Sequence, residues 1–492
     1  MEFLIQGFEV AFKLSNLLAC FMGVFVGTLV GVLPGIGPAA AIAILLPMTF
    51  NITPVAAIIM LGGIYYGAMY GGSTTSILVN IPGEVSSVMT CQDGYQMALQ
   101  GRVGPALGIS AFGSFIGGTL SIIGLMLVAV PLAEVALKFG PPEYFSLVCL
   151  GLIILVHLTG GSVRKGMMMG LFGLALSFVG LDTITGVPRF NFGTIEFMNG
   201  IGIVPLVMGL YGVGEVLINI EKGEEKGSIL KTDFKGLLPS LRDWKDSIGA
   251  ILRGSVVGFL LGILPGGGAV VSTFVAYWLE RKISKHPERL GTGAIEGVAA
   301  PETANNAAVG GSFIPLMVLG IPTTPAIALL MGALIIHGIR PGPDFLGKYP
   351  DIFWGVVASM YIGNCMLLFL NLPLIPVWVQ ILKVPYRVLF PLILLFTFIG
   401  SYSVNNSLFD LEMTIGFGVL GYIFKKFNFE TAPLIMAFVL GPMIEESFRQ
   451  SMIISKGSFI IFISRPASLG FLVLAIASLL FSLIPVFRKR PV

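Results

Sequence analysis

The chain has 492 residues, of which 55% are hydrophobic and only 11% are charged, and its formal net charge is +3. This composition excludes a soluble globular protein and predicts an all-α polytopic membrane protein. The small positive charge does not indicate a nucleic-acid partner, because Lys and Arg lie in short loops between apolar runs, where the positive-inside rule places them. We expect about 10 to 14 membrane segments, some of them too short to cross roughly 30 Å of hydrocarbon.

Residues 1–16 are predicted to form an interfacial amphipathic helix that the mature chain retains. The sequence "LLAC", which ends at Cys20, resembles a lipoprotein cleavage box. However, the segment before it is polar and the hydrophobic run follows it, which is the reverse of a signal peptide. The four cysteines are scattered without paired or metal-type spacing, so ordinary buried thiols are expected.

The stretch "GVLPGIGPAAAIAILLP" (31–47) places two Pro-Gly breaks inside an apolar region. The runs on either side, 18–33 and 39–46, are too short to make two full crossings. A hairpin tip inside the membrane leaves backbone groups unpaired unless they face protein or a water-filled cavity, so such a tip should line a site. We predict a re-entrant hairpin with this tip: Pro34, Gly35, Gly37 and Pro38.

Hydrogen-bonding side chains then gather in the apolar segment "GGSTTSILVNIPG" (71–83), next to Pro82. They are candidates for a binding pocket. The alternative is that Ser and Thr bond back to the preceding turn of their own helix or pack against a neighbouring helix. The set is Ser73, Thr74, Thr75, Ser76 and Asn80.

A hydrophilic stretch with six Lys and Arg residues, 220–247, divides the chain near its middle. We assign it to the cytoplasm as a linker between two halves. The expected organisation is a first membrane repeat with the N-terminal interfacial helix (1–219), the cytoplasmic linker (220–247), a second membrane repeat (248–456), and a C-terminal membrane helix with a basic cytoplasmic tail (457–492).

The second half repeats the first. "GTLVGVLPGIGP" (27–38) and "GFLLGILPGGGA" (258–269) are identical at seven of twelve positions. A second hairpin tip is therefore predicted at Pro265, Gly266, Gly267 and Gly268.

The charges of matching loops alternate between the halves. The loop 280–289 is basic, whereas its counterpart 47–54 has no Lys or Arg, and two further loop pairs alternate in the same way. Alternation is expected for two inverted-topology repeats, an architecture typical of secondary transporters. An ancient duplication without mechanistic meaning is the alternative.

The segment "GIPTTPAIALLMGAL" (320–334) contains a helix start, because Thr324 suits an N-cap and Pro325 suits the first helical position. Discontinuous helices of this kind can hold an anion at their N-terminal amides without a buried Arg. The carbonyl groups at the end of a preceding helix can bind a small cation.

A few charged residues lie within or next to the apolar runs, where charge is costly and usually functional. Glu302 is predicted to bind a coupling cation or to cap a helix at the interface, and the cap is favoured. Glu84 and Asp93 are explained as well by an aqueous vestibule. Glu445 and Arg449 have the spacing of a helical ion pair, with direct substrate contact by Arg449 as the alternative.

At these same residues the chain resembles the large membrane subunit of the tripartite tricarboxylate transporters, the TctA family. The likeness extends over nearly the whole length, through "YGGSTTSILVNIPG", "GILPGGG", "PETANNAAVGGSFIPLMVLGIP" and "GPMIEESFRQSM". It implies a bacterial inner-membrane uptake system for di- and tricarboxylates such as citrate, with Na⁺ as the coupling ion, no other cofactor and an elevator movement. It also implies two partners, a small membrane subunit and a periplasmic solute-binding protein.

Carried onto this chain, the resemblance implies a substrate pocket and places sodium and anion at the two hairpin tips. The pocket would contain Ser73, Thr74, Thr75, Asn80, Thr323 and Thr324, with Asn305 and Asn306 nearby.

Two other classes of protein compete with a transporter. An intramembrane enzyme is not expected, because the sequence has no Gly-x-Gly-Asp pair, no Ser with a plausible His partner and no His-Glu-x-x-His helix. An anion channel, or a transporter for another small organic acid, remains the alternative.

Overall fold

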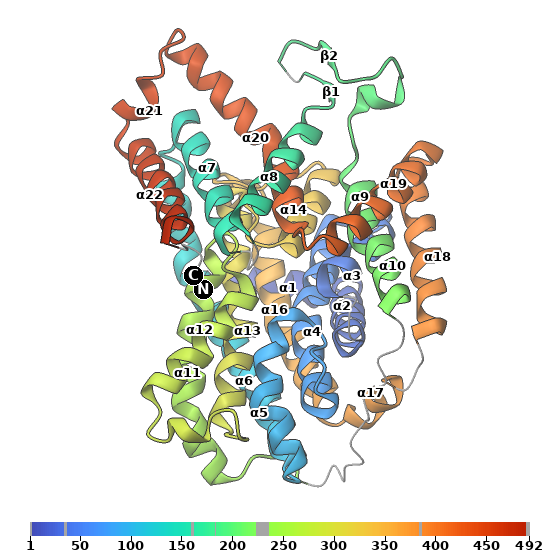
Figure 1. Ribbon diagram of the computed structural model, residues 1–492, viewed down its shortest axis with the longest axis vertical. Helices are drawn as coiled ribbons and strands as arrows, with labels where there is room; N and C mark the ends of the chain where they lie inside the picture. Colours follow the sequence, from blue (N-terminus) through green and yellow to red (C-terminus); the bar gives the residue numbers. More distant parts are fainter. Residues whose placement is uncertain are drawn as a thin grey trace.

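The computed structural model describes residues 2–33, 37–158, 162–182, 184–222, 236–382 and 386–488. Most of them are helical, and the described residues contain a single antiparallel pair of strands, in which Gly180 lies opposite Arg189. This pair, β1 (Gly180–Leu181) and β2 (Pro188–Arg189), projects from the helices at the same end as the loop between α20 and α21 (Figure 1).

Up to residue 222 the helices are α1 (Glu2–Ala11), α2 (Leu14–Val32), α3 (Gly37–Leu45), η1 (Leu46–Thr49), α4 (Pro54–Val79), η2 (Val85–Ser87), α5 (Val88–Leu99), α6 (Val103–Ala136), α7 (Pro141–Leu158), α8 (Val163–Ser177), η3 (Glu196–Asn199), α9 (Ile203–Val207), η4 (Met208–Val213) and α10 (Gly214–Lys222). After it they are α11 (Leu241–Ile263), α12 (Gly268–Ile283), η5 (Pro287–Arg289), α13 (Glu296–Ile314), η6 (Pro315–Leu319), α14 (Pro325–Ile336), α15 (Phe345–Lys348), α16 (Pro350–Asn371), α17 (Ile375–Ile381), α18 (Tyr386–Asn405), α19 (Leu408–Lys426), α20 (Ala432–Ile454), α21 (Ile461–Ser464) and α22 (Pro466–Arg488).

Seven helical segments of the described chain are long and apolar enough to cross a membrane. They are Leu14–Val32, Pro54–Val79, Val103–Ala136, Ile203–Glu221, Leu241–Ile263, Pro350–Asn371 and Val388–Asn405. The sequence-based prediction of an all-α polytopic membrane protein is confirmed at this level.

Each half contains a close helix pair with the same glycine pattern. In α2, a Cβ on Gly31 would lie 2.2 Å from the carbonyl oxygen of Ala68 in α4. In α11, a Cβ on Gly262 would lie 2.2 Å from the carbonyl oxygen of Ala308 in α13. One and two turns before Gly31, a Cβ on Gly27 or Gly23 would also lie close to a backbone carbonyl oxygen of α4. The same holds for Gly258 and Gly254, one and two turns before Gly262, against α13. Glycine is required because the two backbones touch, which is how small residues bring membrane helices together.

Matching turns follow both pairs. After α4, Asn80 takes the left-handed conformation with φ 60°, and after η6, Gly320 does so with φ 69°. An Ile-Pro pair follows each of these two residues. Gly37 and Gly268, which begin α3 and α12, both have positive φ as well. The backbone therefore has the same conformation at matching helix ends and at matching helix starts of the two halves.

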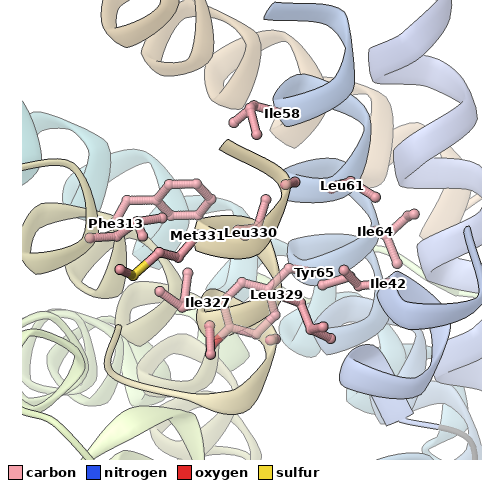
Figure 2. Packing of buried hydrophobic residues seen from close by; sticks show 14 of the residues in the cluster. Ile42, Ile58, Leu61, Ile64, Tyr65, Phe313, Ile327, Leu329, Leu330 and Met331 are labelled. Atoms are coloured by element: carbon pink, nitrogen blue, oxygen red, sulfur yellow. The ribbon is translucent and has the colours of Figure 1, made fainter. Parts of the chain in front are cut away.

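The short helix α14 lies inside the largest hydrophobic cluster. Ile327 and Leu330 are fully buried, together with Ile64 of α4 and Phe313 of α13. Figure 2 shows the α14 side chains between these two helices and close to Tyr65. Burial on all sides fixes the position of the N-terminus of α14, and that end carries part of the candidate site.

The prediction of one helix over 1–16 is wrong in extent. Helix α1 ends at Ala11, and α2 begins at Leu14. The Asn16 side chain donates to the carbonyl oxygen of Val10 at 2.7 Å, which stabilises the turn between them. The following helix therefore starts earlier than the composition indicated.

Candidate functional site

The turn after α11 and the start of α14 lie in direct contact. The backbone N–H of Gly266 donates to the carbonyl oxygen of Thr323 at 2.9 Å. A Cβ on Gly268 would lie 3.0 Å from Cγ2 of Thr324. The structure thus brings together two groups that were predicted separately: the second tip at Pro265, Gly266, Gly267 and Gly268, and the pair Thr323 and Thr324.

Two helices begin at this contact. Helix α12 starts at Gly268 and α14 at Pro325, and the Thr324 hydroxyl accepts a hydrogen bond from the N–H of Ile327 at 3.3 Å. The predicted N-cap role of Thr324 is confirmed. The first N–H groups of a helix lack partners within it and carry partial positive charge. Two adjacent helix starts therefore provide an environment that favours an anion.

Hydroxyl groups accompany these helix starts. Thr324 Oγ1 donates to the Tyr65 hydroxyl of α4 at 3.4 Å. Thr323 is fully buried, and its Oγ1 has no hydrogen-bond partner among the residues that the structure describes. A buried hydroxyl without a partner is unfavourable, and a polar ligand would satisfy it. Tyr65 was not predicted, although a phenol inside the apolar run 55–71 was a usable signal.

The first turn is described only in part. Of its predicted tip residues, Pro34 and Gly35 lie outside the described residues, while Gly37 and Pro38 begin α3. The Thr75 hydroxyl donates to the carbonyl oxygen of Val32 at 2.6 Å. Thr75 therefore pairs a backbone group at the end of α2, directly before the turn.

A second polar network joins the halves around Glu302. This residue is in the interior of α13 and is 0% exposed. One carboxylate oxygen accepts a hydrogen bond from Ser73 of α4, and the other accepts one from Thr90 of α5. The favoured cap role is wrong, since Glu302 lies in the second turn of α13 and binds side chains of other helices.

The network continues through Asn305, one turn further along α13. Asn305 Nδ2 donates to a carboxylate oxygen of Glu84 at 3.2 Å, and Asn305 Oδ1 accepts from the Ser86 hydroxyl at 2.8 Å. Ser86 also donates to Glu84 through its N–H at 2.9 Å. The aqueous-vestibule interpretation of Glu84 is wrong, because the side chain is buried among these partners.

Three predicted pocket residues are not joined to these groups through their side chains. Asn306 Nδ2 donates to the carbonyl oxygen of Glu302 in its own helix at 3.3 Å. Asn80 is an exposed helix-terminal residue. Thr74 is buried, and no side-chain hydrogen bond is found for it within the described part of the chain.

Asp93 of α5 holds the loop before α13. Its carboxylate accepts hydrogen bonds from the backbone N–H groups of Gly291, Gly293 and Ala294 at 2.8–3.0 Å, and from the Tyr277 hydroxyl at 2.8 Å. Because Asp93 is 0% exposed, the vestibule interpretation is wrong here too. The Asp93 carboxylate, from the first half, thus accepts the hydrogen bonds of backbone N–H groups in the second half.

The predicted ion pair of α20 is confirmed and is part of a larger network. Arg449 lies 3.0 Å from Glu445 and 2.6 Å from Asp182, and Arg189 of β2 lies 2.7 Å from Glu445. The N–H of Thr185 and the Arg449 guanidinium hold the pKa of Asp182 well below its usual range. These pairs attach the β1–β2 hairpin to α20.

The interior of this polytopic helical membrane protein thus holds two polar groups, the helix starts with their hydroxyls and the network of buried carboxylates. Membrane transporters belong to this class of protein. The chain belongs to the tripartite tricarboxylate transporter TctA family, whose sequence model matches residues 17–436. This is a transporter family of tripartite systems, whose other parts are a small membrane protein and a periplasmic binding protein.

Two relatives come from Agrobacterium vitis. The chain is 50% identical over 484 residues to an uncharacterized 52.8 kDa protein in the TAR-I ttuC' 3' region, with 98% of this chain and 96% of the relative covered. It is also 50% identical over 233 residues to an uncharacterized protein in the TAR-II ttuC' 3' region, covering 47% of this chain and 96% of the relative. No solved structure matches the chain.

Proposed function

We propose that this large subunit imports di- and tricarboxylates such as citrate across the bacterial inner membrane, coupled to Na⁺ and supplied by the periplasmic binding protein. The observation that carries the proposal is the Gly266–Thr323 contact, which places the N-termini of α12 and α14 together with buried hydroxyls. The buried polar residues of the described chain include no Lys or Arg. Recognition of a carboxylate by helix starts and hydroxyls fits this arrangement.

The test is uptake into vesicles that contain all three subunits, across a panel of carboxylic acids, with and without a sodium gradient. We expect saturable uptake that requires the gradient. Flux that rises without saturation and follows only the substrate gradient would favour an anion channel. Uptake of another organic acid in place of di- and tricarboxylates would correct the substrate class and keep the transporter.

We further propose two inverted repeats with re-entrant hairpins and an elevator movement. The glycine-lined pairs α2–α4 and α11–α13 and the matching left-handed turns support the repeats. Lys165, in one basic loop, donates to the carbonyl oxygen of Phe427 in another at 2.7 Å, which supports a common membrane side for these two loops. The elevator movement follows from the resemblance to transporters with paired hairpins.

Opposite orientation of the halves can be tested by cysteine labelling. Lys285 and Asn51 lie at matching ends of the two halves and are both exposed. In a variant without the four native cysteines, Lys285→Cys should react with an impermeant maleimide from the cytoplasmic side and Asn51→Cys from the periplasmic side. Labelling of both positions from one side would contradict the inverted topology.

The hydroxyl of Thr75 should be needed for transport. Thr75→Val leaves the carbonyl oxygen of Val32 unpaired next to the first turn, at a cost of about 1–3 kcal/mol. We expect uptake to fall by about tenfold, since 1.4 kcal/mol is a factor of ten, with normal membrane insertion. Thr194→Val, at an exposed loop position, is the matched control. Unchanged uptake in both Thr74→Val and Thr75→Val would rule out a pocket beside α4.

A further inference from the structure

We propose that Glu302, together with Ser73 and Thr90, binds the monovalent cation that is coupled to transport, either Na⁺ or H⁺. The inference rests on the proposed function and adds a cation site in the interior of α13, separate from the two turns. It identifies side chains for the coupling ion, which the turns alone do not provide.

Glu302 is an anionic group without a cationic partner. Among the described residues, no Lys, Arg or His lies within ion-pair distance of its carboxylate. The cationic side chain of Arg253, on α11, is paired with Glu280 of α12 at 2.7 Å. A buried carboxylate without such a partner is strongly unfavourable unless it is protonated or binds a cation.

Comparison with Asp93 distinguishes a structural carboxylate from a binding one. Asp93 is equally buried, but three backbone N–H groups and a phenol satisfy it. Glu302 instead accepts from hydroxyl groups, those of Ser73, Thr90 and Ser110 of α6. Hydroxyl oxygens also have lone pairs, so these side chains can turn to bind a cation, whereas an N–H group cannot.

Within the described part of the chain, the surroundings of Glu302 add negative charge and no positive charge. The titratable groups of the described chain that face it are Glu84, directly before η2, Tyr70 of α4 and Cys91 of α5. On α6 the polar contact is uncharged, since Ser114 donates to the carbonyl oxygen of Glu302 at 3.4 Å. A cation at Glu302 would therefore interact favourably with two carboxyl groups.

The position of the site explains how a cation could act on transport. Ser73 and Thr90 belong to the first half and Glu302 to the second, so occupancy affects the contact between the halves. Asn305, one turn from Glu302, joins the same network to Glu84. A ligand that binds one arrangement of these helices better than another shifts the population towards that arrangement.

The first test needs no substrate. Thermal unfolding of the purified full chain in detergent is measured against NaCl, with choline chloride as the reference, and separately against pH. Cation binding to the folded state should raise the unfolding temperature with Na⁺ concentration or with acidification. Glu302→Gln should abolish the Na⁺ dependence, or reduce the stabilisation by acidification below that of the wild type, whereas Glu446→Gln, an exposed carboxyl on α20, should behave as the wild type does. Dependence on neither ion in the wild type, or the same dependence in Glu302→Gln, would overturn the proposal.

The second test uses vesicles with all three subunits and the acid that the wild type takes up best. Glu302→Gln should lose gradient-driven accumulation by at least tenfold and retain exchange of labelled for unlabelled substrate. Loss of both activities at normal membrane abundance would overturn the proposal, because it indicates a substrate-binding or structural role. If wild-type vesicles took up none of the acids, the proposed function would be rejected, and the first test would still decide whether Glu302 binds a cation.

Variants of the two hydroxyl residues cover the case in which Glu302→Gln does not fold. Ser73→Ala and Thr90→Val remove one hydroxyl each, and both should raise the half-saturating Na⁺ concentration, or shift the pH midpoint, by at least threefold in ion concentration. A sodium shift identifies Na⁺ as the coupled ion and a pH shift identifies H⁺. Unchanged midpoints in both variants would contradict a site at Glu302.

Discussion

Replacing Gly262 with alanine should destabilise the folded protein by about 3 kcal/mol, the upper part of the usual range for overpacking. The new Cβ would lie 2.2 Å from the carbonyl oxygen of Ala308, and this atom belongs to backbone that cannot rotate away. Helices α11 and α13 would have to separate along their whole contact. The measurement is the unfolding temperature of the purified chain, with the yield of monodisperse protein as a second readout.

Gly416 of α19 provides the matched control. It lies inside a helix and is exposed, and a Cβ at this position would meet no atom of the described chain within 4 Å. Gly416→Ala should leave stability unchanged or raise it by up to about 1 kcal/mol, because alanine favours helix more than glycine does. Equal effects of the two substitutions would show that the close approach of α11 and α13 does not exist.

Asp93→Asn should be the most damaging substitution among the polar residues outside the proposed ion and substrate sites. An amide in place of the carboxylate removes the charge that three backbone N–H groups share, and its NH₂ group can face those donors directly. Hydrogen bonds to charged groups contribute about 1.5–3 kcal/mol each, so we expect a loss of about 3 kcal/mol or more. Thermal unfolding of the purified chain measures it.

Tyr277→Phe is the graded comparison, since it removes only one of the hydrogen bonds to Asp93. Its expected cost is about 1 kcal/mol. If Asp93→Asn proved as mild as Tyr277→Phe, the carboxylate would not be what holds the loop before α13.

Local signals in the sequence predicted the parts of the site that depend on neighbouring residues. The Thr324–Pro325 pair predicted the start of α14, and the repeated Pro-Gly motif predicted the break before Gly268. A cap and a turn each depend on a few consecutive residues, so a single sequence carries their signal.

The polar partners were not predictable in the same way. Thr90 and Glu302 are separated by 212 positions, and Asp93 and Gly293 by 200. Nothing in the local pattern distinguishes a carboxylate that meets water from one that meets backbone N–H groups of the other half. For this reason the sequence is compatible with a vestibule at Glu84 and Asp93, and it gives no signal for the roles of Thr90 and Ser86.

The Gly266–Thr323 hydrogen bond limits how a bound molecule can leave. Peeling this loop away from α14 by itself would strip a donor and an acceptor of their partners inside the protein, at a cost of about 1–3 kcal/mol for each. The loop and the first turn of α14 should therefore travel as one rigid piece. A bound molecule would then leave on the side away from this loop, or the loop, α12 and α14 would have to move together to release it.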